Sequence, residues 1–102
     1  MKKIVIAVCA VLGAVGVAHA AGDAAAGKAK SVMCAGCHGP DGNSTNPMYP
    51  RLAGQHEQYL ISAIKAYKNG TRNNPIMKPM VAGLSDQDIE NLAAYFSSQK
   101  CK

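Results

Sequence analysis

Apolar residues recur at helical spacing in two parts of the chain. Between Gln55 and Lys68 they follow one another at intervals of three and four, and Asn69-Gly70 ends the segment, with Leu60, Ala63, Ile64 and Tyr67 forming the stripe. Further on, Ser85 is a candidate N-cap, and an apolar face runs to about Gln99 through Ile89, Leu92, Ala93 and Phe96. A period near 3.6 residues predicts two amphipathic helices, over 55–68 and 85–99.

A third helix is predicted from Asp23, a candidate N-cap, through the alanine-rich run 24–33, and it leads directly into Cys34-Ala35-Gly36-Cys37-His38. No stretch alternates with period two for long enough to predict a strand, so the fold class is all-α with three main helices. The segments 39–54 and 70–84 are rich in Gly, Pro and Asn and exceed the usual length of helix connections. We expect these long loops to wrap a ligand.

The first twenty residues differ in character from the rest. They comprise a basic start at Lys2 and Lys3, an apolar run from Ile4 to about Val17, and Ala18-His19-Ala20 as a small-residue cleavage site. This pattern is typical of a secretory signal peptide, and the apolar run is shorter than the ~20 residues that a membrane span needs. We therefore expect residues 1–20 to be cleaved, residues 21–102 to form one domain in the periplasm, and no membrane span to remain.

The apolar content of residues 21–102 is low. Val, Leu, Ile and Phe together number eleven, about 13% of this segment, below the ~20% under which chains are usually disordered. The net charge of this segment is only +3, so strong self-repulsion, the other mark of disorder, is absent. A bound cofactor would supply the missing apolar surface, as metals and disulfides do in other small domains.

The pentapeptide from Cys34 to His38 indicates which cofactor. Two thiols three residues apart, followed at once by an imidazole, can attach a haem through two thioethers and ligate its iron. A thioredoxin-like dithiol would begin a helix after a strand, and a structural zinc site usually needs four ligands, so the sequence favours neither alternative. The prediction is one covalent haem c, with its iron.

Several further motifs stand in an order that resembles class I c-type cytochromes over residues 21–102. The resemblance is strongest to the small bacterial cytochrome c-553 and cytochrome c4 group, through Gly-Asp-Ala-Ala-Ala-Gly, Cys-His-Gly-Pro-Asp-Gly-Asn-Ser, Leu-Ala-Gly-Gln, Tyr59-Leu60, Leu-Ser-Asp-Gln-Asp-Ile and Leu-Ala-Ala-Tyr-Phe. Cytochrome c4 proteins have two haem domains and this chain has one haem motif, so we expect a mono-haem relative. The resemblance implies the small class I cytochrome c fold.

The resemblance also implies residue roles. Cys34 and Cys37 would be the thioether attachments, and His38 the proximal iron ligand. The carbonyl of Pro50 would accept the other imidazole N–H and orient the ring. Gly27 would let the first helix cross closely against an aromatic residue of the last helix, Tyr95 or Phe96.

The second axial ligand is a choice between two methionines. Counting back from Ser85, Met77 stands eight residues before it and Met80 five, and the resemblance favours the longer spacing. Pro79 restricts Lys78 to extended backbone, so we expect the two methionines not to share a helical turn. Met77 is therefore the expected ligand, with Met80 as the alternative.

These features predict an electron-transfer protein and not an enzyme, because no distal acid–base residue can be identified. The expected partners are a redox donor and acceptor, such as membrane-bound complexes or a terminal oxidase or reductase, and no nucleic acid. The alternative is a haem subunit, or a ligand-binding or sensor haem domain, of a larger redox system. A basic group that could face a partner, or be a solvated face, comprises Lys65, Lys68, Arg72 and Lys78. Cys101 is left unpaired and could link two copies in an oxidising compartment.

The low apolar content generates a prediction about how far folding depends on haem. The double variant Cys34→Ala with Cys37→Ala should give a largely unfolded chain, because the protein part alone has too little core. Circular dichroism during thermal denaturation measures this. A cooperative transition with native helix content in the haem-free chain would contradict it.

Overall fold

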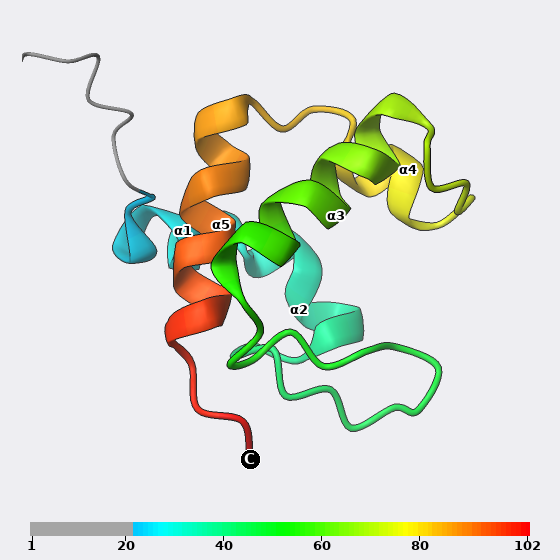
Figure 1. Ribbon diagram of the computed structural model, residues 1–102. Coiled ribbons are helices and arrows are strands. Elements are labelled where there is room, and N and C mark those ends of the chain that lie inside the picture. The colour runs from blue at the N-terminus through cyan, green and yellow to red at the C-terminus, as the bar shows by residue number, and fades with distance from the viewer. Residues whose placement is uncertain (1–21) are drawn as a thin grey trace, which may run out of the picture.

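The structure is a computed structural model that describes residues 22–102. Its helices are α1 (Ala24–Lys30), α2 (Val32–His38), α3 (Glu57–Asn69), α4 (Met77–Val81) and α5 (Asp86–Ser98), arranged as Figure 1 shows. Within the described residues there is no strand. The predicted all-α class is therefore confirmed.

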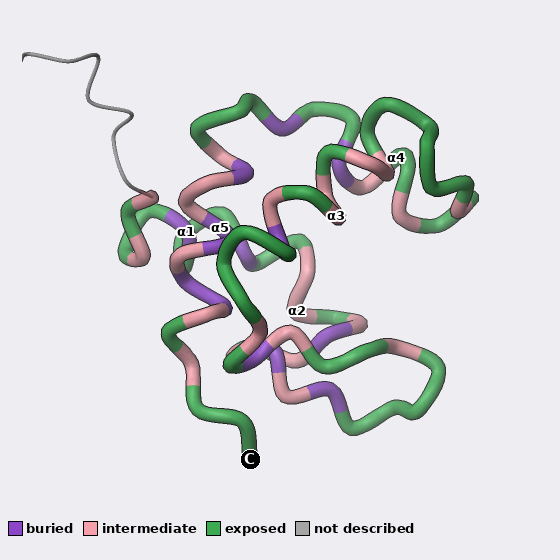
Figure 2. The backbone as a smooth tube through the Cα atoms, viewed as in Figure 1, coloured by how far each residue is buried: buried purple, intermediate pink, exposed green. Residues whose placement is uncertain are grey.

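Helix α5 forms most of the core. Ser85 and Asp88 close a reciprocal capping box at its start, as the Ser85 hydroxyl accepts from the Asp88 amide and the Asp88 carboxylate from the Ser85 amide. Its inward face includes the most deeply buried large side chains of the described chain, Ile89, Leu92 and Phe96. Buried segments accordingly concentrate along α5 and the elements beside it (Figure 2).

Helix α1 crosses α5 so closely that the two backbones are in contact. A Cβ atom at Gly27 would lie 1.9 Å from the carbonyl oxygen of Asn91 and 2.8 Å from the Cβ of Tyr95. Only glycine fits there, which confirms the predicted close crossing and identifies Tyr95 as the aromatic partner. The N-cap of α1, Asp23, accepts from the amides of Ala25 and Ala26, while its own amide donates to the side chain of Asn91.

The prediction of one continuous helix before the haem motif was wrong. The helix is interrupted at Ser31. The amide of Ser31 donates to the carbonyls of both Gly27 and Lys28, and its hydroxyl donates to the carbonyl of Lys28. A serine hydroxyl that bonds back to the preceding turn competes with the regular ladder, and the turn tightens. The two cysteines consequently lie on α2, separate from α1.

Helix α3 occupies almost the expected range, beginning after His56 and ending at Gly70 in the left-handed conformation. Its only buried residue is Leu60, although its apolar stripe is longer. Near its end, the ammonium group of Lys68 donates to the carbonyl of Leu84, 2.5 Å away. This bond ties α3 to the segment between α4 and α5.

The loop 70–84 contains a short helix that the sequence did not predict. Met77 and Met80 both lie on α4, so the expectation that Pro79 would keep them off one helical turn was wrong. Pro79 is the third residue of α4, where the amide of a helix has no intrahelical partner, and proline therefore costs no hydrogen bond.

The proposed signal peptide, residues 1–20, lies outside the described residues. Among residues 22–102, no helix is long and apolar enough to cross a membrane.

The crossing at Gly27 generates a prediction about stability. Gly27→Ala should lower the free energy of unfolding of the haem-loaded protein by roughly 3 kcal/mol, because α1 must move away from α5. Gly83→Ala is the matched control, since its Cβ would meet nothing within 4 Å, and it should change stability by about 0.5 kcal/mol or less. Guanidinium titration measures both. Equal stability of the two variants would contradict the close crossing.

Candidate haem site

The haem motif forms α2. Cys34 and Cys37 are three residues apart on this helix, so their side chains share one side of it, and both are half-buried free thiols. His38 is the last residue of α2 and is only 6% exposed. One short helix thus presents both attachment groups and the imidazole.

The ring of His38 is held by the following loop. Its Nδ1–H donates to the carbonyl oxygen of Pro50 over 2.8 Å, and the ring of Tyr49 lies edge-on to it at 6.3 Å between centroids. The other ring nitrogen, Nε2, has no hydrogen-bond partner within residues 22–102, yet it is not sealed from solvent. The bond to Pro50 fixes the tautomer in which Nε2 carries the free lone pair, which is the form that ligates a metal.

Several apolar side chains that pack against the core cluster are only partly covered by protein. They come from α2, the loop before α3, α3 itself and α4, and each is half-buried while packing against the core cluster: Cys34, Leu52, Ile61, Ile64, Tyr67 and Met77. Partly covered apolar surface, together with a buried histidine that has a free nitrogen, fits a large apolar group bound at the two cysteines. The residues present therefore fit a haem.

Both candidate methionines are half-buried on α4. Met77 packs against the core cluster, and the side chain of Asn74 accepts from the amides of Ile76 and Met77, at 2.9 and 3.0 Å. Asn74 thereby fixes the start of α4. The sequence reasoning did not single out Asn74, although Asn-Pro is a common turn signal.

The end of α5 holds the loop 39–54 in place. The hydroxyl of Tyr95 donates to the carbonyl of Pro40, and the amide of Gly54 donates to the carbonyl of Phe96. Gly42 has a φ of 84°, and a Cβ there would lie 2.8 Å from the Phe96 ring. Both ends of the loop that carries Pro50 are therefore attached to the same helix.

Ser44 is a buried hydroxyl that the sequence reasoning missed. Its Oγ lies 3.3 Å from the carbonyl oxygen of Cys37 and 2.9 Å from that of Asn46, so it connects the end of α2 to the loop. No local pattern marks it, because the burial of a loop serine depends on the tertiary structure.

The thiols do not resemble those of a dithiol oxidoreductase. Burial raises the pKa of the Cys34 thiol, and the nearby Cys37 raises it further. Attacking thiols of that class have lowered values instead. Within residues 22–102, no three His, Cys, Asp and Glu side chains lie together as a zinc site would require.

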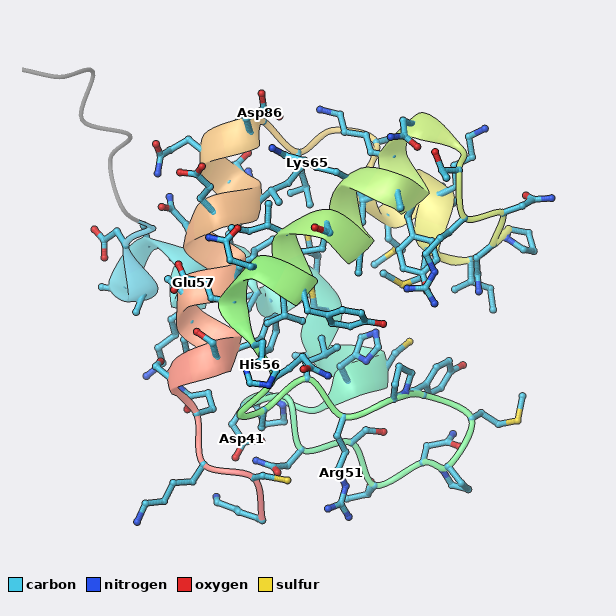
Figure 3. All side chains as sticks on the ribbon, in the orientation of Figure 1. Asp41, Arg51, His56, Glu57, Lys65 and Asp86 are labelled. Carbon is cyan, nitrogen blue, oxygen red and sulfur yellow. The ribbon has the colours of Figure 1, made fainter. Side chains whose placement is uncertain are left out.

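Other polar features lie away from the motif. His56 is an exposed residue at the N-cap of α3. An open depression of about 760 Å³ borders the loop 39–54, and its lining includes Asp41, Arg51 and Lys102 but none of the motif residues. Figure 3 shows Asp41 and Arg51 beside the end of the chain, at the opposite end of the molecule from Lys65 and Asp86.

Comparisons with known proteins agree with this site. The sequence profile of the Cytochrome c family matches residues 24–100. The chain is 50% identical to cytochrome c4 of Pseudomonas aeruginosa over 98% of the chain and 50% of that protein. It is 54% identical to cytochrome c-554(548) of Halomonas halodenitrificans over 78% of the chain and 100% of that protein.

A solved structure supports the same assignment. Reduced cytochrome c4 from Pseudomonas stutzeri superposes with a TM-score of 0.77 at 47% identity, covering 80% of this chain and 48% of that one. The chain spans about half the length of the cytochrome c4 relatives that it matches. With its Cys-x-x-Cys-His motif, which implies one covalently attached haem c, the chain belongs to the cytochrome c family.

Proposed function

We propose that this protein is a one-electron carrier of the periplasm and not an enzyme. Residues 1–20 would be its cleaved signal peptide and residues 21–102 a cytochrome c domain. The observation that carries the proposal is the buried His38 with Nδ1 bonded to Pro50 and Nε2 free, beside two half-buried cysteines. When bound, haem c supplies an iron that alternates between two oxidation states one electron apart.

The protein residues would have distinct roles. Cys34 and Cys37 attach the haem, His38 ligates the iron, and the Pro50 carbonyl orients the imidazole and increases its donor strength. Met77 completes the ligation as a thioether, which raises the reduction potential relative to a second histidine. The same protein ligands serve both oxidation states, so little has to rearrange as the electron moves.

Redox partners are part of this proposal. Of the four basic residues near α3 and α4, Lys68 bonds to Leu84 and Arg72 lies 4.6 Å over the ring of Tyr67. All four are exposed, but Lys65 and Lys78 take no part in these two contacts, which supports them as the groups that face an acidic partner. Cys101 is also exposed, and its disulfide-linked dimer stays a prediction.

The electron-carrier function generates a spectroscopic prediction. The haem-loaded protein should titrate with a slope of about 59 mV per tenfold change in the oxidised-to-reduced ratio, as a one-electron couple requires. The spectrum of the reduced protein should not change under carbon monoxide, because His38 and a methionine would both ligate the iron and leave no open position for it. A carbon monoxide complex that forms readily would instead favour the ligand-binding or sensor alternative.

The axial ligand generates a second prediction. Met77→Ala should abolish the weak ferric methionine–iron band in the near-red and lower the reduction potential, because the iron loses a ligand that prefers the ferrous state.

Met80→Ala is the matched comparison. It should keep the band and cost less than the ~2–5 kcal/mol of a fully buried methionine, since Met80 is only half-buried. If the band survives in Met77→Ala and is lost in Met80→Ala, Met80 is the ligand.

A further inference from the structure

The side chain of Asn43 joins the loop 39–54 to residues 100–102. Its Nδ2 donates to the carbonyl of Lys100 over 2.9 Å, and its Oδ1 accepts from the amide of Lys102 over 2.7 Å. One amide side chain therefore pairs with the backbone on both sides of Cys101, as a neighbouring strand would.

Two further contacts join the same segments. The guanidinium of Arg51 donates to the backbone oxygen of Lys102 over 2.7 Å, and the ammonium of Lys102 lies 3.2 Å from the Asp41 carboxylate. Hydrogen bonds from Asn43, and then the contact with Lys102, lower the pKa of Asp41 to about 2, so it is ionised at neutral pH. We call the contacts of Asn43 and Arg51 with residues 100–102 the clasp.

The clasp acts on a part of the loop that is mostly exposed, where the other restraints are the bonds among Ser44, Asn46 and Tyr49 and the contact of the Tyr49 ring with His38. Residues 45–48 are exposed, as are Pro50 and Arg51, so core packing does not position this stretch. Proline has no amide hydrogen, so Pro50 donates no backbone hydrogen bond that would hold it. On its C-terminal side the next attachment is the amide of Leu52, which donates to the carbonyl of Gly42.

The position of the Pro50 carbonyl matters because it accepts the hydrogen bond from Nδ1–H of His38. A hydrogen bond weakens steeply when its angle departs from linear, and the donor strength of a ligating imidazole follows the bond at its other nitrogen. Arg51 is the residue next to Pro50, and Asn43 lies across the loop next to Gly42. The clasp thus restrains the loop from both sides of this carbonyl.

We propose that Asn43 and Arg51 are positioning residues for the haem ligand, which hold the Pro50 carbonyl against His38 by binding residues 100–102. The proposal rests on the proposed ligation by His38. It assigns to the final residues of this chain an influence on the reduction potential, although none of them lines the apolar surface beside the motif.

The test measures the imidazole proton itself. In the reduced, haem-loaded protein, Asn43→Ala should speed solvent exchange of the His38 Nδ1 proton, followed by NMR, by about threefold to tenfold, because the loop opens more often. The reduction potential should rise, since a weaker bond to Pro50 makes the imidazole a poorer donor to ferric iron. Arg51→Met should act in the same direction, and Arg51→Lys, which keeps a donor, should act less.

The control is Asn73→Ala, which removes an exposed asparagine of another loop and should change neither quantity. If both Asn43→Ala and Arg51→Met speed exchange only at the amides of residues 100–102, and leave the His38 proton and the potential as in the unmodified protein, the proposal is overturned. Should Asn43→Ala fail to fold, the comparison of Arg51→Met with Arg51→Lys tests the proposal without it. A failure of the electron-carrier proposal would appear separately, as carbon monoxide binding or a wrong titration slope.

Discussion

The contact between α1 and α5 at Gly27 is the constraint on which the rest of this structure depends. The Cα of Gly27 lies so close to the Asn91 carbonyl that no side chain fits between the helices. This contact fixes α1, and the short turn at Ser31 then determines where α2 and its cysteines can lie. Because α5 contains most of the buried large side chains, the close approach of Gly22 and Gly27 to α5 places the haem motif relative to the main core.

Helix α5 also positions the loop whose carbonyl orients the ring of His38. Tyr95 and Phe96 bond to residues near the two ends of the loop 39–54, and this loop contains the carbonyl that accepts from His38. α5 therefore positions both the helix that ends in the imidazole and the backbone that orients it. A ligand held from two directions by one rigid element needs little rearrangement when the charge on its metal changes, which suits a protein that transfers electrons.

The low apolar content and the partly covered lining have one explanation. The eleven Val, Leu, Ile and Phe residues of 21–102 cannot enclose a core of ordinary size, and six partly buried side chains of α2, α3, α4 and the loop before α3 pack against the core cluster. A haem would cover the other side. The cofactor in this protein would thus be both the redox centre and a large part of the hydrophobic core, so folding and haem attachment should be coupled.

The sequence by itself determined the features that depend on local chemistry. The N-caps at Asp23 and Ser85, the helical stripes and the Cys-x-x-Cys-His motif all act through neighbours a few residues away. The close crossing at Gly27 was expected only through the resemblance to class I cytochromes. The tertiary structure decided the features that depend on distant partners. Helix α4 around Pro79, the burial of Ser44 and the pairing of Asn43 with residues 100–102 were missed for this reason. The turn at Ser31 forms with Gly27 and Lys28, but helix propensity alone does not predict it. A backbone hydrogen bond is worth about the same in a helix, a turn or a cap, so contacts with other segments decide which one forms.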